Sequence, residues 1–255
     1  MRGIDVSSHQ GKIDWNSVKS SGIDFVIIRA GYGNSTIDKC FEYNITEALK
    51  VGLKVGVYWF CYALNEKEAR EEADFCIKTV KPYKLSFPIF YDFEYDTERY
   101  AKERKVTFTP QSRCSVIKAF CTRAKELGHE VGIYTNLDYI QHRLNFDDLK
   151  AYPLWLATYN DDEEQSPLGE MLKQVTDSGK VAGIKGNVDM NVGYITFTDN
   201  EPSEWSKEAV EWAVKNKILQ GDENGDYKLR EPCTTERFIT LLHRALKNIE
   251  LEIGE

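Results

Sequence analysis

The chain has 255 residues, of which 42% are hydrophobic and 29% are charged, and its formal net charge is -8. This composition is typical of a globular protein with one large domain, or with one domain of about 200 residues and a smaller one. The negative charge argues against nucleic acid as a partner, and no segment is long and apolar enough to suggest a membrane partner.

Strand-like and helix-like segments alternate along the first 198 residues. The sequence predicts strands at 3–6, 25–30, 54–60, 87–92 and 131–134, with intervening helices at 15–20, 39–51, 66–80 and 110–127. Further strands are predicted at 154–157, 172–176 and 187–190, without long helices between them. Strand–helix alternation implies parallel strands with right-handed crossovers, and eight strands would close a barrel. The charged segment at 95–109 is expected to be a loop over a cleft or a solvated turn.

Asp92 and Glu94 follow the fourth predicted strand, at the sequence Tyr-Asp-Phe-Glu-Tyr. Side chains alternate along a strand, so the two carboxylates are expected to point the same way. Two crowded carboxylates cannot both ionise cheaply, and one pKa rises. The pair then divides into an acid and a base or electrostatic stabiliser, as glycoside hydrolysis requires. A solvated acidic loop is the alternative.

Other polar and aromatic residues fall at or near predicted strand ends, where barrels of this kind carry their chemistry. Asp5 and Asp189 are candidates, with helix capping and a turn as their structural alternatives. Arg29 is expected to form a buried ion pair with Asp5 or Glu94. Aromatic candidates for sugar contacts, which could equally be core residues, are Tyr32, Tyr58, Tyr134 and Trp155.

Seven segments in order resemble glycoside hydrolase family 25, the muramidases or lysozymes of phage endolysins and bacterial autolysins. The longest is GIDVSSHQGKIDW at 3–15, and the others lie at 25–33, 56–58, 91–94, 132–136, 153–157 and 188–191. The resemblance covers about residues 1–197 and implies an α/β fold: a modified TIM-like barrel of the (β/α)5β3 type. It also implies cleavage of the β-1,4 bond between N-acetylmuramic acid and N-acetylglucosamine in peptidoglycan, without a cofactor or metal.

Roles follow from the resemblance at the matched positions. Glu94 is similar to the general acid, and Asp92 to the carboxylate that stabilises the anomeric centre or orients the acetamido group. Asp189 and Asp5 match carboxylates that complete an acidic floor. Gln174 lies in the seventh strand as Leu-Lys-Gln-Val-Thr, without the aromatic neighbours usual in the family, and is expected to contact substrate. Whether the second step uses a protein nucleophile or the substrate's acetamido oxygen stays open.

Two other functions remain possible at this point. One is hydrolysis of another N-acetylated glycan such as chitin. The other is a wall-binding module built on a degenerate barrel, although four acids at strand ends argue against it. Six cysteines without a Cys-x-x-Cys pair and four histidines without ligand spacing argue against zinc and favour a reducing compartment. With no apolar leader before residue 3, we expect synthesis in a bacterial cytoplasm without a signal peptide, and action at the wall after release.

A polar, proline-bearing linker is predicted at 199–203, which separates the barrel at 1–198 from a small helical domain at 204–255. This second domain resembles a single S-layer-homology repeat. The resemblance implies binding to a secondary wall polymer or self-association into a homo-oligomer. Asp222, Asn224 and Asp226 are spaced like calcium ligands, but Tyr227 and Cys233 replace the glycine and glutamate of an EF-hand, so that site is not expected.

Overall fold

The computed structural model describes residues 1–159, 166, 168–195, 200, 202, 204–229, 231 and 233–253. The chain divides into two compact units, Met1–Ile195 and Thr196–Glu255. The predicted linker at 199–203 lies largely outside the described residues. Within the described part of the chain, no helix is long and apolar enough to cross a membrane.

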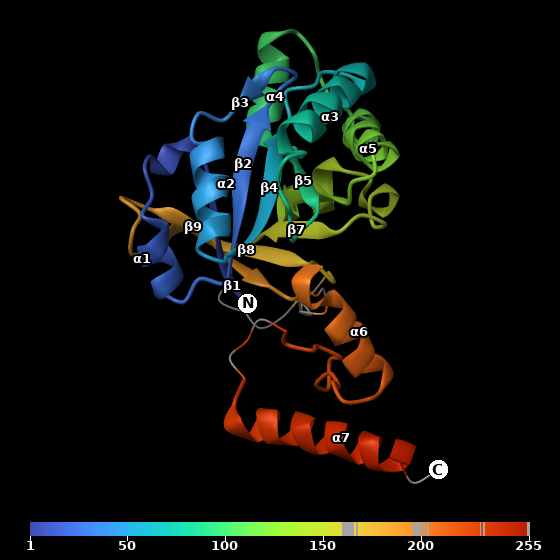
Figure 1. The fold of residues 1–255 in the computed structure, drawn as a ribbon. Helices are drawn as coiled ribbons and strands as arrows, with labels where there is room; N and C mark the ends of the chain where they lie inside the picture. The colour runs from blue at the N-terminus through green and yellow to red at the C-terminus, as the bar shows by residue number, and fades with distance from the viewer. Residues whose placement is uncertain are drawn as a thin grey trace. The chain divides into compact units, whose positions relative to one another are not determined.

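Eight strands of the first unit close into a barrel (Figure 1). They follow the order β1-β9-β8-β7-β6-β5-β4-β2, and pairing of β1 with β2 closes the ring. Their bounds are β1 Arg2–Val6, β2 Phe25–Tyr32, β4 Lys54–Phe60, β5 Ile89–Asp92, β6 Val131–Asn136, β7 Leu154–Ala157, β8 Leu172–Gly179 and β9 Val188–Gly193. The short strand β3, Thr36–Ile37, forms a hairpin with β2. The predicted α/β barrel is confirmed.

Strand direction differs from the prediction at one position. Six neighbouring pairs, from β1–β2 round to β7–β8, are parallel, whereas β9 runs antiparallel to both β8 and β1. Asp189 is the second residue of β9 and lies near the amino end of that strand, not at its carboxyl end. Because β9 is reversed, its beginning meets the carboxyl ends of the parallel strands, and Asp189 still reaches the mouth of the barrel.

Helices cover the outside of the first strands and become short after β6 (Figure 1). The α-helices are α1 Trp15–Ser20, α2 Phe41–Lys50, α3 Glu66–Val80, α4 Tyr95–Glu103 and α5 Pro110–Glu126. Short helices are η1 Ser8–Gln10, the π-helix η2 Tyr139–Arg143 and η3 Phe146–Asp148. The start of α5 follows its sequence signal: Pro110 occupies the first turn, and the Thr109 side chain accepts a hydrogen bond from Ser112 N.

Helix α4 corrects the prediction of a loop or turn at 95–109. Its sequence is mostly charged, but Thr97 and Ala101 are buried. Thr97 Oγ1 also donates a 2.9 Å hydrogen bond to Cys61 O. These two small residues, four positions apart, pack one face of α4 against the barrel, and the other faces meet water. Two small residues do not form a periodic apolar pattern, so the sequence does not predict this helix.

Side chains alternate along β5 between the layer that packs against the helices and the interior of the barrel. Ile89 and Tyr91 join the large cluster between the barrel and its helices, and the Tyr91 ring stacks on Phe120 of α5 at 3.9 Å. Phe90 faces the other way and contacts Trp155 of β7, with ring centroids 5.5 Å apart. The barrel interior is thus filled by aromatic rings, and substrate can reach its mouth but not its centre.

The second unit contains η4 Glu204–Ser206, α6 Lys207–Lys215 and α7 Thr235–Ile253. Between the two longer helices, Asp222 Oδ1 accepts hydrogen bonds from the backbone N of Asn224 and Asp226, at 2.9 and 3.1 Å. Lys228 Nζ lies 3.3 Å from the same carboxylate. These contacts make the Asp222 segment a turn closed by its own backbone and a lysine.

Candidate active site

Four carboxyl groups meet at the mouth of the barrel. Asp5 lies near the end of β1, Asp92 ends β5, Glu94 lies two residues after Asp92, and Asp189 is the second residue of β9. The predicted juxtaposition of these residues is observed. Asp92 and Glu94 line a cavity of about 710 Å³, together with aromatic side chains from β2 and β4.

Asp92 and Glu94 point to the same side because the backbone stays extended between them. Glu94 has φ -145° and ψ -167°, and α4 begins at the next residue. Phe93, between them, turns into the core against Phe108, with ring centroids 5.3 Å apart. Asp92 is 5% exposed, and its Oδ1 has no hydrogen-bond partner among the described residues.

The electrostatics of this pair oppose the ionisation of both carboxyl groups together. Burial, then the charges of Asp96 and Asp189, raises the pKa of Glu94 to about 7. Burial, then the charge of Glu94, raises the pKa of Asp92 well above its usual value. When Glu94 holds the proton, one of the charges that raise the Asp92 pKa disappears, so the pair can divide into an acid and a carboxylate.

Asp5 and Asp189 form the second carboxyl pair. They are register partners on the antiparallel strands β1 and β9 and share a side-chain hydrogen bond. Burial, then the charge of Asp189, raises the pKa of Asp5 well above its usual value, and burial also raises the pKa of Asp189. The shared bond raises the pKa of Asp5 and lowers that of Asp189, the directions expected when Asp5 is the donor.

Amide side chains hold Asp5 in place. Its Oδ2 accepts hydrogen bonds from Gln174 Nε2 at 2.9 Å and from Asn191 Nδ2 at 2.7 Å. Gln174 Oε1 in turn accepts from the hydroxyls of Tyr134 and Tyr159, each at 3.0 Å. Gln174 is 3% exposed, so its role in the structure is to join Asp5 to two tyrosines, and the predicted direct contact with substrate is not supported.

Trp155 was predicted either to contact a sugar or to be a core residue, and in the structure it is buried. It is 1% exposed, its Nε1 donates a 2.7 Å hydrogen bond to Asn191 Oδ1, and its ring packs against Tyr134 and Tyr58 with centroids 4.6 and 5.9 Å away. Trp155 therefore packs against the buried sides of Tyr58 and Tyr134 and fixes the positions of their rings. Tyr58 and Tyr134 are themselves partly exposed.

Arg29 has a different partner from the one predicted. Its guanidinium pairs with the buried Asp38, at 2.7 Å, and donates a 3.2 Å hydrogen bond to Ser8 Oγ. Asp38 also accepts from the backbone N of Ser8 and Cys40. The prediction of Asp5 or Glu94 as partner was wrong because the sequence does not show that the β2–β3 hairpin brings Asp38 alongside Arg29. Both Arg29 and Tyr32 line the cavity.

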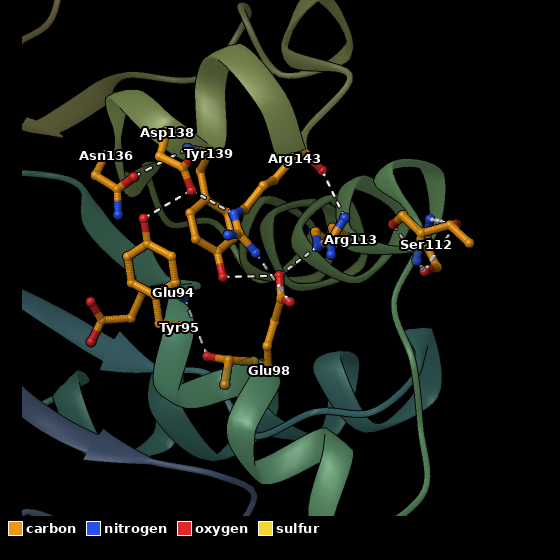
Figure 2. Close-up of polar contacts among 11 residues, drawn as sticks. Glu94, Tyr95, Glu98, Ser112, Arg113, Asn136, Asp138, Tyr139 and Arg143 are labelled. Atoms are coloured by element: carbon orange, nitrogen blue, oxygen red, sulfur yellow. Dashed lines mark hydrogen bonds and ion pairs between the residues drawn. The ribbon is translucent and has the colours of Figure 1, made fainter.

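Helix α4 is fixed at the end next to Glu94 by polar contacts, as Figure 2 shows. Glu98 Oε1 accepts from Arg113 Nε at 2.7 Å and from the Tyr139 hydroxyl at 2.9 Å. The Tyr95 hydroxyl donates to Asp138 Oδ2 at 2.9 Å. The Glu94 carboxylate points away from this network (Figure 2), so the contacts hold its backbone and leave its carboxyl group facing the cavity.

Sequence reasoning missed Asn191, Tyr159, Asp38 and the network around Glu98. Asn191 lies two residues after Asp189 on β9, and the period-2 rule would have placed both on one face. Asp38 depends on the β2–β3 hairpin, which was not predicted, and the other two depend on tertiary contacts for which one sequence carries no signal. Within the described residues, no group of three or more His, Cys, Asp or Glu side chains is arranged to hold a metal ion.

Comparison with known families places these residues in context. The family model described as "Glycosyl hydrolases family 25" matches residues 4–184. The autolytic lysozyme of Clostridium acetobutylicum is 28% identical over 191 residues, which are 75% of this chain and 55% of that protein. Lysozyme M1 of Streptomyces globisporus is 29% identical over 200 residues, covering 75% of this chain and 67% of that protein.

Solved structures show the same likeness. The modular autolysin LytC of Streptococcus pneumoniae aligns with a TM-score of 0.67 at 33% identity, over 76% of this chain and 46% of that one. A bacterial lysozyme from Streptomyces coelicolor aligns with a TM-score of 0.65 at 26% identity, over 77% of this chain and 93% of that one. The chain thus spans about half the length of the Clostridium and Streptococcus proteins.

Proposed function

Because the chain belongs to glycosyl hydrolase family 25, we propose that it is a peptidoglycan hydrolase, an N-acetylmuramidase that cleaves the β-1,4 bond between N-acetylmuramic acid and N-acetylglucosamine. The observation that carries this proposal is the Asp92–Glu94 pair, in which a carboxyl group with a pKa of about 7 adjoins a second buried carboxyl in an open cavity. LytC was solved in complex with a synthetic peptidoglycan ligand, which supports the same substrate class here.

In the proposed reaction Glu94 is the general acid. Its proton passes to the glycosidic oxygen as the bond to the anomeric carbon breaks, and the bonding electron pair stays on that oxygen. Asp92, ionised while Glu94 holds the proton, faces the positive charge that develops at the anomeric carbon, either directly or through the acetamido group. Water then adds to the anomeric carbon and returns a proton to Glu94.

Asp5 and Asp189 serve the acid indirectly in this proposal. The negative charge of Asp189 contributes to the raised pKa of Glu94. Asp5, held neutral by its shared proton, fixes the position of Asp189 through their hydrogen bond. Tyr58 and Tyr134 offer partly exposed rings to a sugar at the same mouth.

For the second unit we propose wall attachment or self-association. On α7 the side chains of Phe238, Ile239, Leu242 and Leu246 are 60, 57, 47 and 53% exposed. An apolar face of this kind on a single helix is costly in water unless a partner covers it. Deletion of residues 202–255 should therefore weaken binding to walls or reduce the oligomer size in sedimentation. If neither changes, the second unit has another role.

The test of the main proposal is mass spectrometry of the fragments released from purified walls, with chitin as the alternative substrate. Products that end in reducing N-acetylmuramic acid, absent with Glu94→Gln, are expected. The matched control is Glu42→Gln, which alters an exposed glutamate of α2. Products with reducing N-acetylglucosamine ends, or cleavage of chitin alone, would show that the protein is a glycosidase of another specificity and not a muramidase. Binding without cleavage of any wall would favour a binding module.

A further inference from the structure

A buried carboxyl group in the helix layer contacts the chain segment that adjoins the acid pair. Glu72 lies on α3, which covers the outside of the barrel (Figure 1), and it is 1% exposed. It faces the loop of residues 61–63, which follows β4. Burial of a carboxyl group is costly unless hydrogen bonds offset the cost. The partners of Glu72 therefore indicate what this group does in the fold.

Glu72 fixes the loop 61–63 by two contacts. Its Oε1 accepts a 2.9 Å hydrogen bond from Tyr62 N. Its Oε2 lies 2.8 Å from the hydroxyl oxygen of Tyr91 on β5, and the same oxygen lies 2.9 Å from Cys61 Sγ. Glu72 thus links the loop to α3 directly and to β5 through the Tyr91 hydroxyl.

A proton on Glu72 completes these contacts. The Tyr91 hydroxyl has one proton, so it can donate to Glu72 or to Cys61 but not to both. Burial raises the pKa of Glu72 to about 8, so this carboxyl group is mostly protonated at neutral pH. The protonated carboxyl can donate to the Tyr91 oxygen, which leaves the hydroxyl proton for Cys61 Sγ. In this arrangement Glu72 is an uncharged donor and acceptor, and a glutamine can take the same two roles.

The loop 61–63 is bonded in turn to both members of the acid pair. Cys61 N donates a 2.9 Å hydrogen bond to the backbone carbonyl of Asp92, the residue that ends β5. Cys61 O accepts a 2.9 Å hydrogen bond from Thr97 Oγ1 on α4. The same hydroxyl oxygen accepts from Glu94 N at 3.4 Å. Cys61 therefore holds the backbone of Asp92 directly and that of Glu94 through Thr97.

The residues that connect Glu72 to the acid pair are buried. Cys61, Tyr91 and Thr97 are each 0% exposed. Water does not reach such groups without a change in packing, so a bond lost here is not simply replaced by a bond to solvent. Loss of the polar atoms of Glu72 leaves the Tyr62 amide without this acceptor and the Tyr91 hydroxyl with one contact fewer. The loop then moves to find other partners, and the backbone segments bonded to it move as well.

We propose that Glu72 is a positioning residue for the acid pair: through the loop 61–63 it sets the separation and direction of Asp92 and Glu94. The proposal rests on the proposed function only for the reaction that the pair performs. Placement of the reacting groups matters because a displacement of about 1 Å can cost about a hundredfold in rate. A residue of the helix layer thus controls kcat through the backbone of the site.

The kinetic test uses purified walls, at a temperature at which circular dichroism shows every variant to be folded. Glu72→Met keeps the length of the side chain and removes its polar atoms, so kcat should fall about ten- to a hundredfold with KM nearly constant. Glu72→Gln can accept from Tyr62 N and donate to the Tyr91 oxygen, so its kcat should stay within about threefold of the parent value. The control is Ile77→Ala, which removes buried carbon atoms from the same helix and should lower the melting temperature but not kcat.

Three results would overturn the proposal. One is a kcat of Glu72→Met equal to that of the parent. The second is an equal loss of kcat in Glu72→Met and Ile77→Ala, because lost stability would then account for both. The third is a Glu72→Gln variant as impaired as Glu72→Met. If Glu72→Met does not fold, Tyr91→Phe, which removes the hydroxyl between Glu72 and Cys61, should lower kcat about three- to tenfold, and an unchanged kcat would equally overturn the proposal.

Amide hydrogen exchange separates this proposal from the proposed function, because it needs no turnover. In Glu72→Met the amides of Cys61 and Glu94 should exchange at least about tenfold faster than in the parent, with the strand amides of β6 and β7 as the reference for global unfolding. Glu72→Gln should exchange as the parent does. This result would support the positioning role even if the parent cleaves no wall, an outcome that would refute the proposed function alone. Unchanged exchange at both amides would refute the positioning role, whatever the parent cleaves.

Discussion

Each of the two carboxyl pairs at the barrel mouth joins a buried aspartate, Asp5 or Asp92, to a partly exposed acid, yet their surroundings differ. Asp5 accepts hydrogen bonds from two amide side chains and shares a proton with Asp189 across a strand ladder. Asp92 Oδ1 has no partner among the described residues, and Glu94 faces an open cavity. Burial raises pKa values in both pairs, but hydrogen bonding makes one pair a fixed support and leaves the other available to react.

Substitution of Asp92 should give the largest effect among the tests of this contrast. Asp92→Asn keeps the shape but removes the charge that faces the developing cation, so kcat should fall about 10²- to 10³-fold with little change in KM. Steady-state kinetics on purified walls measures this. If kcat falls less than tenfold, Asp92 does not stabilise the developing charge, and Glu94 is the only reactive group of the pair.

Asp189→Asn should have an intermediate effect that appears mainly in the pH profile. The charge of Asp189 raises the pKa of Glu94, so its removal should lower that pKa. Because the proposed mechanism needs protonated Glu94, the alkaline limb of kcat/KM should move to lower pH. Activity at pH 7 should fall about tenfold, while activity at pH 5 should change less. An unchanged limb would show that Asp189 does not act on Glu94.

Glu98→Ala tests whether the contacts of α4 position Glu94. It removes the acceptor for Arg113 and Tyr139, both buried, and should lower the free energy of unfolding by about 1–3 kcal/mol and kcat about threefold or more. Thermal unfolding and kinetics at several pH values measure both. The control is Glu126→Ala, which breaks exposed pairs with Arg70 and Arg123 and should lower the free energy of unfolding less than Glu98→Ala does. Equal effects of the two variants would remove the positioning role.

Asp5→Asn should have the smallest effect, within about threefold in kcat/KM. The asparagine oxygen can accept from Gln174 and Asn191, and its amide can donate to Asp189 as protonated Asp5 does. Asp5→Ala, which leaves those amides unpaired, should be more damaging in both activity and thermal stability. If Asp5→Asn is as inactive as Asp92→Asn, then the pair of Asp5 and Asp189 is as directly involved in the reaction as the pair of Asp92 and Glu94.

The sequence predicted the four acids of the site better than the residues that hold them in place. Alternation along β5 put Asp92 and Glu94 on one side, and the ordered motifs located Asp5 and Asp189 at the same mouth. The direction of β9 escaped prediction because its residues alternate in the same way whichever way the strand runs. Arg29 was assigned the wrong partner because the β2–β3 hairpin, which brings Asp38 beside it, was not predicted. Helix α4 was taken for a loop because its contacts come from Cys61, Arg113 and Tyr139, which are distant in sequence.

The alkaline limb of kcat/KM is the most direct test of the central claim that Glu94 supplies the proton. The group must be protonated to act, and its pKa in the folded protein is raised to about 7, so activity should decline about tenfold per pH unit above that pH. The limb should disappear from the residual activity of Glu94→Gln. A profile that stays flat well above pH 7, or the same limb in Glu94→Gln, would contradict the assignment.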